Sequence, residues 1–273
     1  MKGANETGTA IAVTIAGSDS GGGAGIQADL KTFSALGVYG ASVVTALTAQ
    51  NTVGVQDIHD VPPAFVAAQL DSVFSDLSVD AVKIGMLSRP DVIEAVAEGL
   101  KRHGGERVVL DPVMVAASGD RLLAPEAIDT LRRVLIPRAL LVTPNLPEAA
   151  ALLDEPVAGD EEAMRAQGER ILAFGPRAVL VKGGHAEGTE SVDVLVEASG
   201  VRRFGSPRVA TRNTHGTGCT LSSAIAAGLA KGLGLDEAVA GGKAFVSAAI
   251  GASERLRIGR GHGPVHHFHA LWS

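Results

Sequence analysis

The sequence is poor in aromatic residues, which make up 3% of its 273 positions, and it contains a single cysteine. One cysteine cannot form an internal disulfide, which is typical of proteins in a reducing, cytoplasmic compartment. No apolar run approaches the ~18–20 residues that cross a bilayer, so we expect no membrane partner. The net charge of −6 and the lack of a Lys/Arg cluster argue against a nucleic-acid partner.

Apolar residues make up 46% of the chain and fall into short segments of two alternating kinds. Runs typical of buried strands alternate with longer segments that have helical periodicity. We predict strands at residues 11–16, 43–47, 81–84, 108–110, 140–143 and 178–181, and a hairpin at 192–196 and 202–204. We predict helices at residues 26–36, 63–73, 90–103, 124–135, 161–174, 221–230 and 236–253. This alternation predicts an α/β fold with helices on both faces of a mainly parallel sheet.

No linker, repeat or long charge run divides the chain. We therefore expect a short polar N-terminal extension over residues 1–9, without the apolar segment of a signal peptide, and one domain over residues 10–273. In parallel sheets of this kind, ligands bind beyond the carboxyl ends of the strands. Polar residues that follow the strands are therefore the first candidates for a functional site.

The segment Gly216-Thr217-Gly218-Cys219, called the anion turn below, precedes an apolar helix and holds the only cysteine. Its glycines allow a sharp turn, and the unpaired N–H groups of a helix's first turn attract an anion such as phosphate. Cys219 has three interpretations: a small buried apolar residue, a covalent nucleophile, or a general base. The helix N-terminus favours the thiolate and a bound triphosphate opposes it, so we expect a pKa near neutrality.

Polar residues also follow other predicted strands. Asn145 and Glu148 suit Mg²⁺ and its waters, but these residues taken alone favour a capping box at the start of a helix. Lys182, which two glycines follow, either reaches phosphate oxygens or extends from the strand end into water. Asp111 either serves a metal or caps a turn.

Two further segments carry weaker signals. The glycine-rich residues 17–25, called the glycine loop below, match neither the dinucleotide-binding nor the P-loop spacing, so they form either a ligand loop or a plain turn. Residues 261–269 hold four of the eight histidines. We favour a packed C-terminal segment over a metal cluster there, because no cysteine or carboxylate joins the histidines.

Taken together, several motifs resemble the hydroxymethylpyrimidine and phosphomethylpyrimidine kinases of thiamine biosynthesis, in the vitamin-kinase branch of the ribokinase-like superfamily. These motifs lie in residues 22–33, 49–52, 83–87, 143–149, 182–185, 213–221 and 263–269. The resemblance implies a ribokinase-like three-layer α/β/α sandwich without a large separate lid domain. It also implies ATP-dependent phosphorylation of 4-amino-5-hydroxymethyl-2-methylpyrimidine, and then of its monophosphate to the pyrophosphate.

The resemblance assigns roles on the phosphate side of the site. Family members hold the transferring phosphoryl group in an anion hole, which corresponds here to Gly216, Thr217, Gly218 and Cys219. Cys219 stands where sugar kinases of the superfamily use an aspartate base. Lys182 and Asn145 would bind the phosphates of ATP. Glu148 and Asp111 would organise Mg²⁺.

The resemblance also assigns roles on the pyrimidine side. Gln50 would hydrogen-bond the polar edge of the ring. The other residues implied to lie close to the substrate are Asp29, Gly17, Met86 and Val113. Residues 113–119 would form a mobile flap over the site, and relatives in this branch make a homodimer the expected assembly.

Three alternative functions stay open. A pyridoxal or pyridoxine kinase of the same branch would phosphorylate a similar hydroxymethyl group. A non-catalytic phosphate-binding regulator would bind without turnover, but it leaves the combination of Gln50, Lys182 and Cys219 unexplained. A cysteine-nucleophile hydrolase would need an activating histidine. His215 is near in sequence, but no residue that would orient it is evident.

Overall fold

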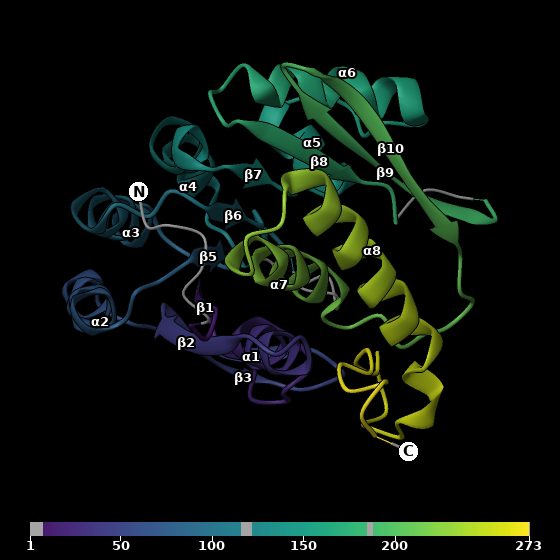
Figure 1. The fold of residues 1–273 in the computed structure, drawn as a ribbon, viewed down its shortest axis with the longest axis horizontal. Coiled ribbons are helices and arrows are strands. Elements are labelled where there is room, and N and C mark those ends of the chain that lie inside the picture. The colour runs from purple at the N-terminus through teal and green to yellow at the C-terminus, as the bar shows by residue number, and fades with distance from the viewer. Residues whose placement is uncertain (1–7, 116–121, 185–187, 273) are drawn as a thin grey trace.

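The structure is a computed structural model that describes residues 8–115, 122–184 and 188–272. Most of the predicted N-terminal extension lies outside these residues, and the division into an extension and one domain stays a prediction. Eight strands form one sheet in the order β10-β9-β8-β7-β6-β5-β1-β2 (Figure 1). Their bounds are Ile11–Ala16 (β1), Tyr39–Val44 (β2), Ala81–Ile84 (β5), Val108–Leu110 (β6), Leu141–Val142 (β7), Ala178–Lys182 (β8), Glu190–Glu197 (β9) and Gly200–Pro207 (β10).

The strands from β2 across to β8 run parallel. At one edge of the sheet, β9 pairs antiparallel with both β8 and β10. The central strands are short and buried on both faces, which is why their sequences are almost continuously apolar. The predicted hairpin at the edge is confirmed, and its outer strand β10 is largely exposed.

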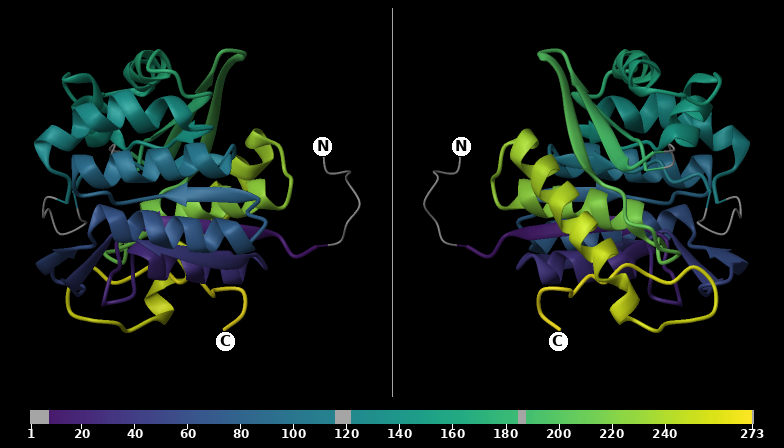
Figure 2. Two further views of the ribbon diagram at one scale, coloured as in Figure 1. Left: turned by 90° about the vertical axis from the view of Figure 1, so that its left-hand side faces the viewer. Right: turned by 90° about the vertical axis from the view of Figure 1, so that its right-hand side faces the viewer.

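The inner strands of the main sheet contribute to two apolar clusters, because successive side chains point to opposite faces. Val82 and Ile84 of β5 join the cluster on one face, and Ala81 joins the other. The first face is covered by α2 (Pro63–Asp76), α3 (Pro90–His103), α4 (Pro125–Thr130), α5 (Leu146–Leu153) and α6 (Glu161–Leu172). The second is covered by α1 (Gly25–Ala35), α7 (Thr217–Ala230) and α8 (Leu235–Gly251). The side views show α2 and α3 in front on one side, and α8 on the other (Figure 2).

One predicted strand, 43–47, is wrong in its extent. The chain leaves the main sheet at Thr45, whose hydroxyl donates to the carbonyl of Met86 at 2.9 Å. The residues that follow form β3 (Ala46–Gln50), which pairs antiparallel with β4 (Val55–Asp60) in a separate two-stranded sheet. The strand β4 is not predictable from apolar periodicity because half of its residues are exposed. The predicted helix 124–135 is α4 continued by a π-helical turn at Leu131–Leu135, and short 3₁₀ turns lie at Ile136–Arg138 and Ser253–Arg255.

The predicted fold class is confirmed: the described residues form a three-layer α/β/α sandwich with a mainly parallel sheet and no large separate lid domain. Among the helices that the structure describes, none combines the length and apolar character needed to cross a membrane.

The second helix layer covers a buried ion pair. Lys83 of β5 lies 2.8 Å from Asp29 of α1, and both side chains are 0% exposed. Thr14 and Ser223 donate further hydrogen bonds to the Asp29 carboxylate, at 2.6 and 2.7 Å. Burial disfavours the charged ammonium, yet the neighbouring Asp29 holds the pKa of Lys83 above its ordinary value, so Lys83 is charged at neutral pH. A buried carboxylate with this many donors ties β1, β5, α1 and α7 together.

We expect Lys83→Met to lower the free energy of unfolding by roughly 3–5 kcal/mol, because it leaves Asp29 as an uncompensated buried charge. The double variant Lys83→Met/Asp29→Asn should recover part of this loss. Urea unfolding followed by circular dichroism measures both effects. The exposed pair Arg165–Glu169 is the matched control, and Arg165→Met should change stability very little. A Lys83 variant no less stable than this control contradicts the expectation.

Candidate active site

The carboxyl ends of the parallel strands meet the N-terminus of α7 at one edge of the sheet. Gly17 follows β1, Met86 lies just after β5, Asp111 follows β6, and Lys182 ends β8. The sequence predicted that residues after these strands would gather there, and they do. Their functional roles stay predictions.

The anion turn is shaped by its glycines. Gly216 has φ 80°, a left-handed conformation that favours glycine, and a side chain there would overlap the carbonyl oxygen of Gly23. A side chain at Gly218 would lie 3.3 Å from Lys182 Nζ and 3.5 Å from Asp111 Oδ2. The start of α7, with its unpaired N–H groups, therefore lies directly against a buried charged cluster.

This charged cluster consists of Asp111, Lys182 and Glu148. Lys182 Nζ lies 2.6 Å from Asp111 Oδ1 and 3.9 Å from Glu148 Oε2. Although burial raises the pKa of Asp111, Lys182 and Lys83 hold it below its usual range. Burial raises the pKa of Glu148 to about 7, with repulsion from Asp111 adding to the effect and Lys182 opposing it. With Glu148 ionised the cluster has an excess of negative charge, which a divalent cation would relieve.

The capping box that the sequence favoured is present. Glu148 N–H donates to Asn145 Oδ1 at 2.8 Å, and Asn145 N–H donates to Glu148 Oε2 at 2.7 Å. This cap does not exclude a metal role, because the same Glu148 oxygen also faces Lys182. Two buried carboxylates suit Mg²⁺, which usually takes one or two carboxylates together with phosphate and water oxygens. Among the described residues there is no group of three or more ligands that could hold a metal ion unaided.

The expectation that Cys219 has a pKa near neutrality is wrong for this structure. Burial raises the pKa of the thiol to about 11, and the opposing attraction of Lys83 and a hydrogen bond from Gly25 N–H do not offset it. The nearby charges of Asp29 and Asp111 add to the rise. Cys219 is therefore protonated at neutral pH, which argues against an activated covalent nucleophile.

The pyrimidine-side residues are only partly brought together. A side chain at Gly17 would lie 3.1 Å from Met86 Sδ, so these two residues adjoin. Gln50 of β3 is partly exposed and joined to the glycine loop, because Ser20 Oγ and the backbone of Gln50 exchange two 2.8 Å hydrogen bonds. Val113 is partly exposed just after Asp111. The predicted flap at 113–119 lies mostly outside the described residues.

Asp29, which the family resemblance implies to lie close to the substrate, is fully buried in the structure. It has no exposed surface, and both its oxygens accept hydrogen bonds from Lys83, Thr14 and Ser223. In this arrangement Asp29 offers no free oxygen to a ligand, so any influence on a substrate passes through its neighbours.

Sequence reasoning missed a pair that joins the glycine loop to the anion turn. His215 Nε2 lies 2.8 Å from Asp19 Oδ2, although the two residues are 196 positions apart. An aspartate inside a glycine-rich turn signals local capping, but nothing in the sequence signals the histidine that meets it. His215 thus has the orienting partner that the sequence left unidentified.

The packed C-terminal segment that the sequence favoured buries His266 and His267, whereas His262 is exposed and His269 partly exposed. His267 Nε2 lies 3.1 Å from Thr220 Oγ1 on α7, and burial lowers the pKa of His267 to about 3. A neutral, buried histidine in contact with a hydroxyl is a packing residue. None of these histidines belongs to a metal-binding group among the described residues.

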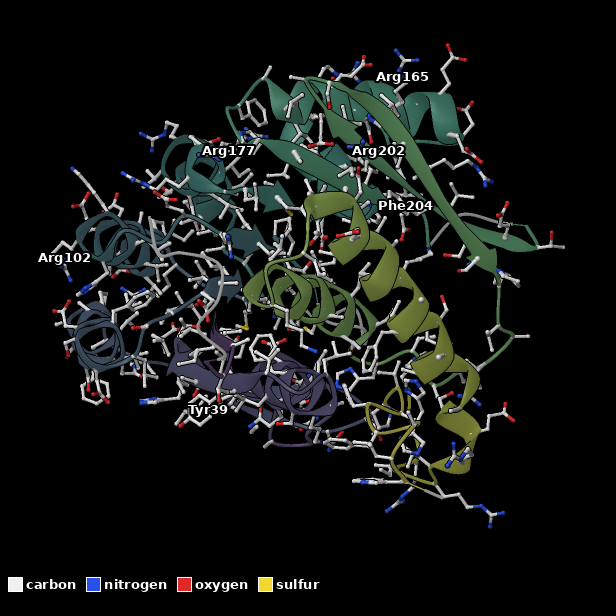
Figure 3. All side chains as sticks on the ribbon, in the orientation of Figure 1. Tyr39, Arg102, Arg165, Arg177, Arg202 and Phe204 are labelled. Atoms are coloured by element: carbon white, nitrogen blue, oxygen red, sulfur yellow. The ribbon has the colours of Figure 1, made fainter. Side chains whose placement is uncertain are left out.

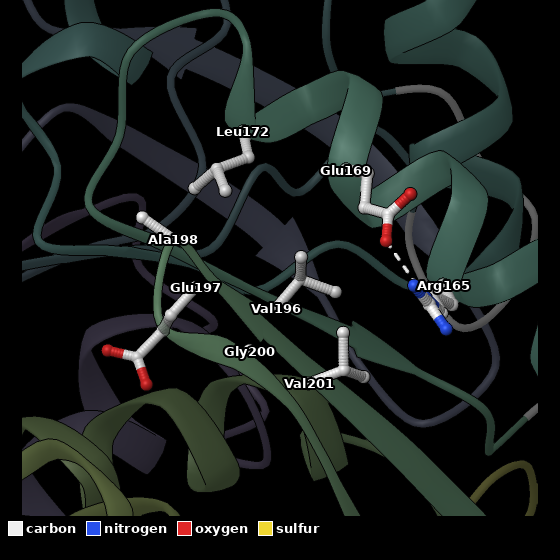
Figure 4. Close-up of a pocket in the computed structure, with 8 residues that line it drawn as sticks. All are labelled: Arg165, Glu169, Leu172, Val196, Glu197, Ala198, Gly200 and Val201. Atoms are coloured by element: carbon white, nitrogen blue, oxygen red, sulfur yellow. Dashed lines mark hydrogen bonds and ion pairs between the residues drawn. The ribbon is translucent and has the colours of Figure 1, made fainter.

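A surface hollow of about 470 Å³ lies away from this site, between α6 and the turn of the β9–β10 hairpin (Figure 4). Glu197 at its rim pairs with Ala178, the first residue of β8, so the hollow is at the amino end of the parallel strands. Arg165 and Glu169, both on α6, form an exposed ion pair at its rim. Its position opposite the strand ends that gather Asp111 and Lys182 excludes it from the candidate site.

The chain belongs to the phosphomethylpyrimidine kinase family, whose pattern matches residues 19–266. It is 61% identical to the hydroxymethylpyrimidine/phosphomethylpyrimidine kinase of Rhizobium meliloti, over 97% of this chain and 99% of that protein. It is 60% identical to the protein of the same name from Salmonella typhimurium, over 96% and 98% of the two chains. The family resemblance drawn from the motifs is confirmed.

Solved structures place the fold among vitamin kinases. A pyridoxal kinase of Bacillus subtilis in complex with ADP superposes with a TM-score of 0.90 at 37% identity, covering 97% of this chain and 100% of that one. The phosphomethylpyrimidine kinase of Clostridium difficile superposes with a TM-score of 0.78 at 46% identity, covering 88% and 99%. The ribokinase-like fold implied by the motifs is confirmed.

The raised pKa of Cys219 predicts slow and strongly pH-dependent alkylation. Because only the thiolate reacts, the iodoacetamide rate should rise about tenfold per pH unit between pH 7 and 10 without levelling off. Mass spectrometry of the intact protein measures this rate at one position, since the chain has no other cysteine.

The matched control for this titration is an exposed thiol, Ser34→Cys on α1 in a Cys219→Ser background. Its alkylation rate should level off above a pKa of about 8.5. A plateau for Cys219 at or below that of the control contradicts the raised pKa.

Proposed function

We propose that this protein transfers the γ-phosphoryl group of ATP to 4-amino-5-hydroxymethyl-2-methylpyrimidine, and then phosphorylates the monophosphate to the pyrophosphate. The observation that carries the proposal is the position of the anion turn against Lys182, Asp111 and Glu148. The relatives that bear the corresponding name at about 60% identity support the choice of substrate over pyridoxal. Family members with ATP-type ligands, such as a pyridoxal kinase of Staphylococcus aureus with AMP-PCP and pyridoxal, support the nucleotide.

In this proposal the phosphates of ATP lie between Lys182 and the N–H groups of the anion turn. Phosphoryl transfer needs alignment and neutralisation of spreading negative charge more than covalent help from the protein. Lys182 and the start of α7 supply fixed positive potential at that point. Asn145 orients Glu148 through the capping box and adds a carboxamide near the phosphates. Mg²⁺, held by Glu148 and Asp111, would supply further neutralisation of the phosphate charge.

On the acceptor side, Gly17 and Met86 line the ring, Gln50 hydrogen-bonds its polar edge, and Val113 packs on it. The hydroxyl oxygen attacks the γ-phosphorus, the bond to the bridging oxygen of ADP breaks, and the hydroxyl proton must leave. We assign Cys219 as the acceptor of that proton. Its raised pKa means that the reactive thiolate is a minor form at neutral pH, so the first step should accelerate with pH.

The oligomeric state and the cellular location of the protein are also part of this proposal. We propose a homodimer, as relatives in this branch suggest, and a cytoplasmic location, as the single cysteine indicates. A pyridoxal kinase activity is the second candidate function, because a pyridoxal kinase shares the fold at a TM-score of 0.90.

A coupled ADP-release assay tests the proposed function with three acceptors: hydroxymethylpyrimidine, its monophosphate and pyridoxal. We expect turnover of the first two to exceed that of pyridoxal, because the relatives at about 60% identity bear the name hydroxymethylpyrimidine/phosphomethylpyrimidine kinase. Turnover of pyridoxal alone supports the second candidate. Nucleotide binding without turnover of any acceptor supports the regulator.

Two variants, one at the site and one remote from it, test whether this activity depends on the site. Lys182→Met should lower kcat/KM by about 10²–10³-fold, as expected for loss of a group that faces the developing charge. Lys101→Met, on an exposed turn of α3 at the far end of the sheet, should leave the activity unchanged.

If Cys219 accepts the hydroxyl proton, Cys219→Ala should affect the two phosphorylation steps unequally. The first step has an alcohol as nucleophile and should slow about 10²-fold. The second has a phosphate as nucleophile, needs no strong base and should slow much less. Between pH 7 and 9 the first step should accelerate in the parent protein but not in the variant. Equal losses in both steps, or the same pH profile in both proteins, would exclude the base role.

A further inference from the structure

The carboxylate of Asp19 organises the glycine loop from within. Its oxygens accept hydrogen bonds from the backbone N–H groups of Gly21, Gly23 and Ala24, at 2.8 to 2.9 Å. Asp19 is 1% exposed. Burial raises the pKa of this carboxyl, but the hydrogen bonds from His215 and the backbone hold it below its ordinary value, so Asp19 is ionised at neutral pH. The loop that carries Gly17 therefore turns around a buried negative charge.

His215 brings the anion turn to this charge. It is 6% exposed and directly precedes Gly216, and its Nε2 lies 2.8 Å from Asp19 Oδ2. The ring fills the space that a side chain at Gly23 would need, and Gly23 O lies where a side chain at Gly216 would project. The two loops are thus in contact through backbone atoms, and the side chains of Asp19 and His215 add a second contact between them.

The backbone of His215 is held on its other side by the C-terminal segment. His215 N–H donates to Gly263 O at 3.0 Å, and His215 O accepts from Val265 N–H at 3.3 Å, forming a parallel bridge. The same segment is joined to the β3–β4 turn, where His262 N–H donates to Thr52 O at 2.9 Å. His215 therefore links the glycine loop, the anion turn and the C-terminal segment.

We propose that Asp19 and His215 form a positioning pair that sets the anion turn relative to the glycine loop, and hence the phosphoryl group relative to the acceptor hydroxyl. This inference rests on the proposed function, because the glycine loop carries the acceptor side and the anion turn the phosphate side. Displacement of a reacting group by about 1 Å can cost about 10²-fold in rate. Neither residue is required to touch a substrate.

The competing explanation is that the pair only stabilises the fold, and a second His–Asp pair provides a control that is matched in residue types but more exposed to solvent. His103 Nε2 lies 2.8 Å from Asp71 Oδ1, between α3 and α2. This pair has the same residue types and the same separation as Asp19–His215. Its neighbour Arg102 lies at the outer edge of the molecule, remote from α7 (Figure 3).

The first test compares His215→Gln with His215→Asn. Both are neutral amides, but only the longer glutamine should reach Asp19 with an N–H donor, so we expect His215→Gln to retain kcat within about threefold. His215→Asn and His215→Ala should lower kcat about tenfold or more with little change in the KM of either substrate, because the lost alignment matters in the transition state. Asp19→Ala/His215→Ala should lose little more than Asp19→Ala alone, because Asp19→Ala already removes the pair together with the loop hydrogen bonds of Asp19. The same substitutions at His103 should leave both constants unchanged.

A second readout needs no kinase activity. Cys219 is partly exposed, and release of the anion turn should expose it further, so iodoacetamide should modify His215→Asn about tenfold faster than the parent protein at pH 8. His103→Asn should match the parent. If the parent phosphorylates no pyrimidine, the proposed function fails, and the alkylation rates still decide whether the pair holds the turn. Equal kinetics for the glutamine and asparagine variants, an effect on KM alone, or unchanged alkylation would overturn the proposal.

Discussion

The packing of α7 on one face of the sheet, with its first turn at the carboxyl ends of the strands, is the constraint on which the rest of the structure depends. The helix is almost entirely buried, so its first turn meets strand ends and loops rather than solvent on its inner side. Beneath it lie two buried ion pairs, Lys83 with Asp29 and Lys182 with Asp111. Buried charges of this kind persist only where partners and hydrogen bonds compensate for lost hydration. The donors from Thr14, Thr143, Ser222 and Ser223 provide that compensation.

The same burial decides the state of the lone cysteine. A helix N-terminus favours a thiolate and from sequence predicts an easily ionised thiol, and in the structure the charge of Lys83 also favours the thiolate. In the folded protein, loss of hydration and the carboxylates of Asp29 and Asp111 outweigh them, and the pKa rises to about 11. A kinase site differs in this respect from a cysteine hydrolase site. The proposed proton transfer uses the minor thiolate form, which is a strong base because the pKa of the thiol is high, whereas a covalent nucleophile needs a stable thiolate.

The local sequence pattern was sufficient to predict those strands and helices in which one physical signal, such as an apolar run, dominated. The buried strands β1, β5 and β6 and the helix α3 were predicted at their observed bounds, because apolar runs and helix-ending residues are encoded locally. The separate β3–β4 sheet was not predicted. It is exposed along much of its length. Its position depends on two hydrogen bonds between segments distant in the sequence, from the Thr45 hydroxyl to Met86 O and from the Thr48 hydroxyl to Ser18 O. The capping box of Asn145 and Glu148 was readable because both partners lie within one turn.

The sequence by itself determined the α/β class, the edge of the sheet where polar residues gather, and the family to which the chain belongs. These follow from periodicity along short segments and from motifs of contiguous residues. Only the tertiary structure decided that Asp29 is sealed behind Lys83, that Cys219 is protonated at neutral pH, and that Asp19 meets His215 across 196 positions. Each depends on which groups share a buried volume. Burial and the distance between charges are set by how distant segments pack, and a linear pattern of residues does not encode that.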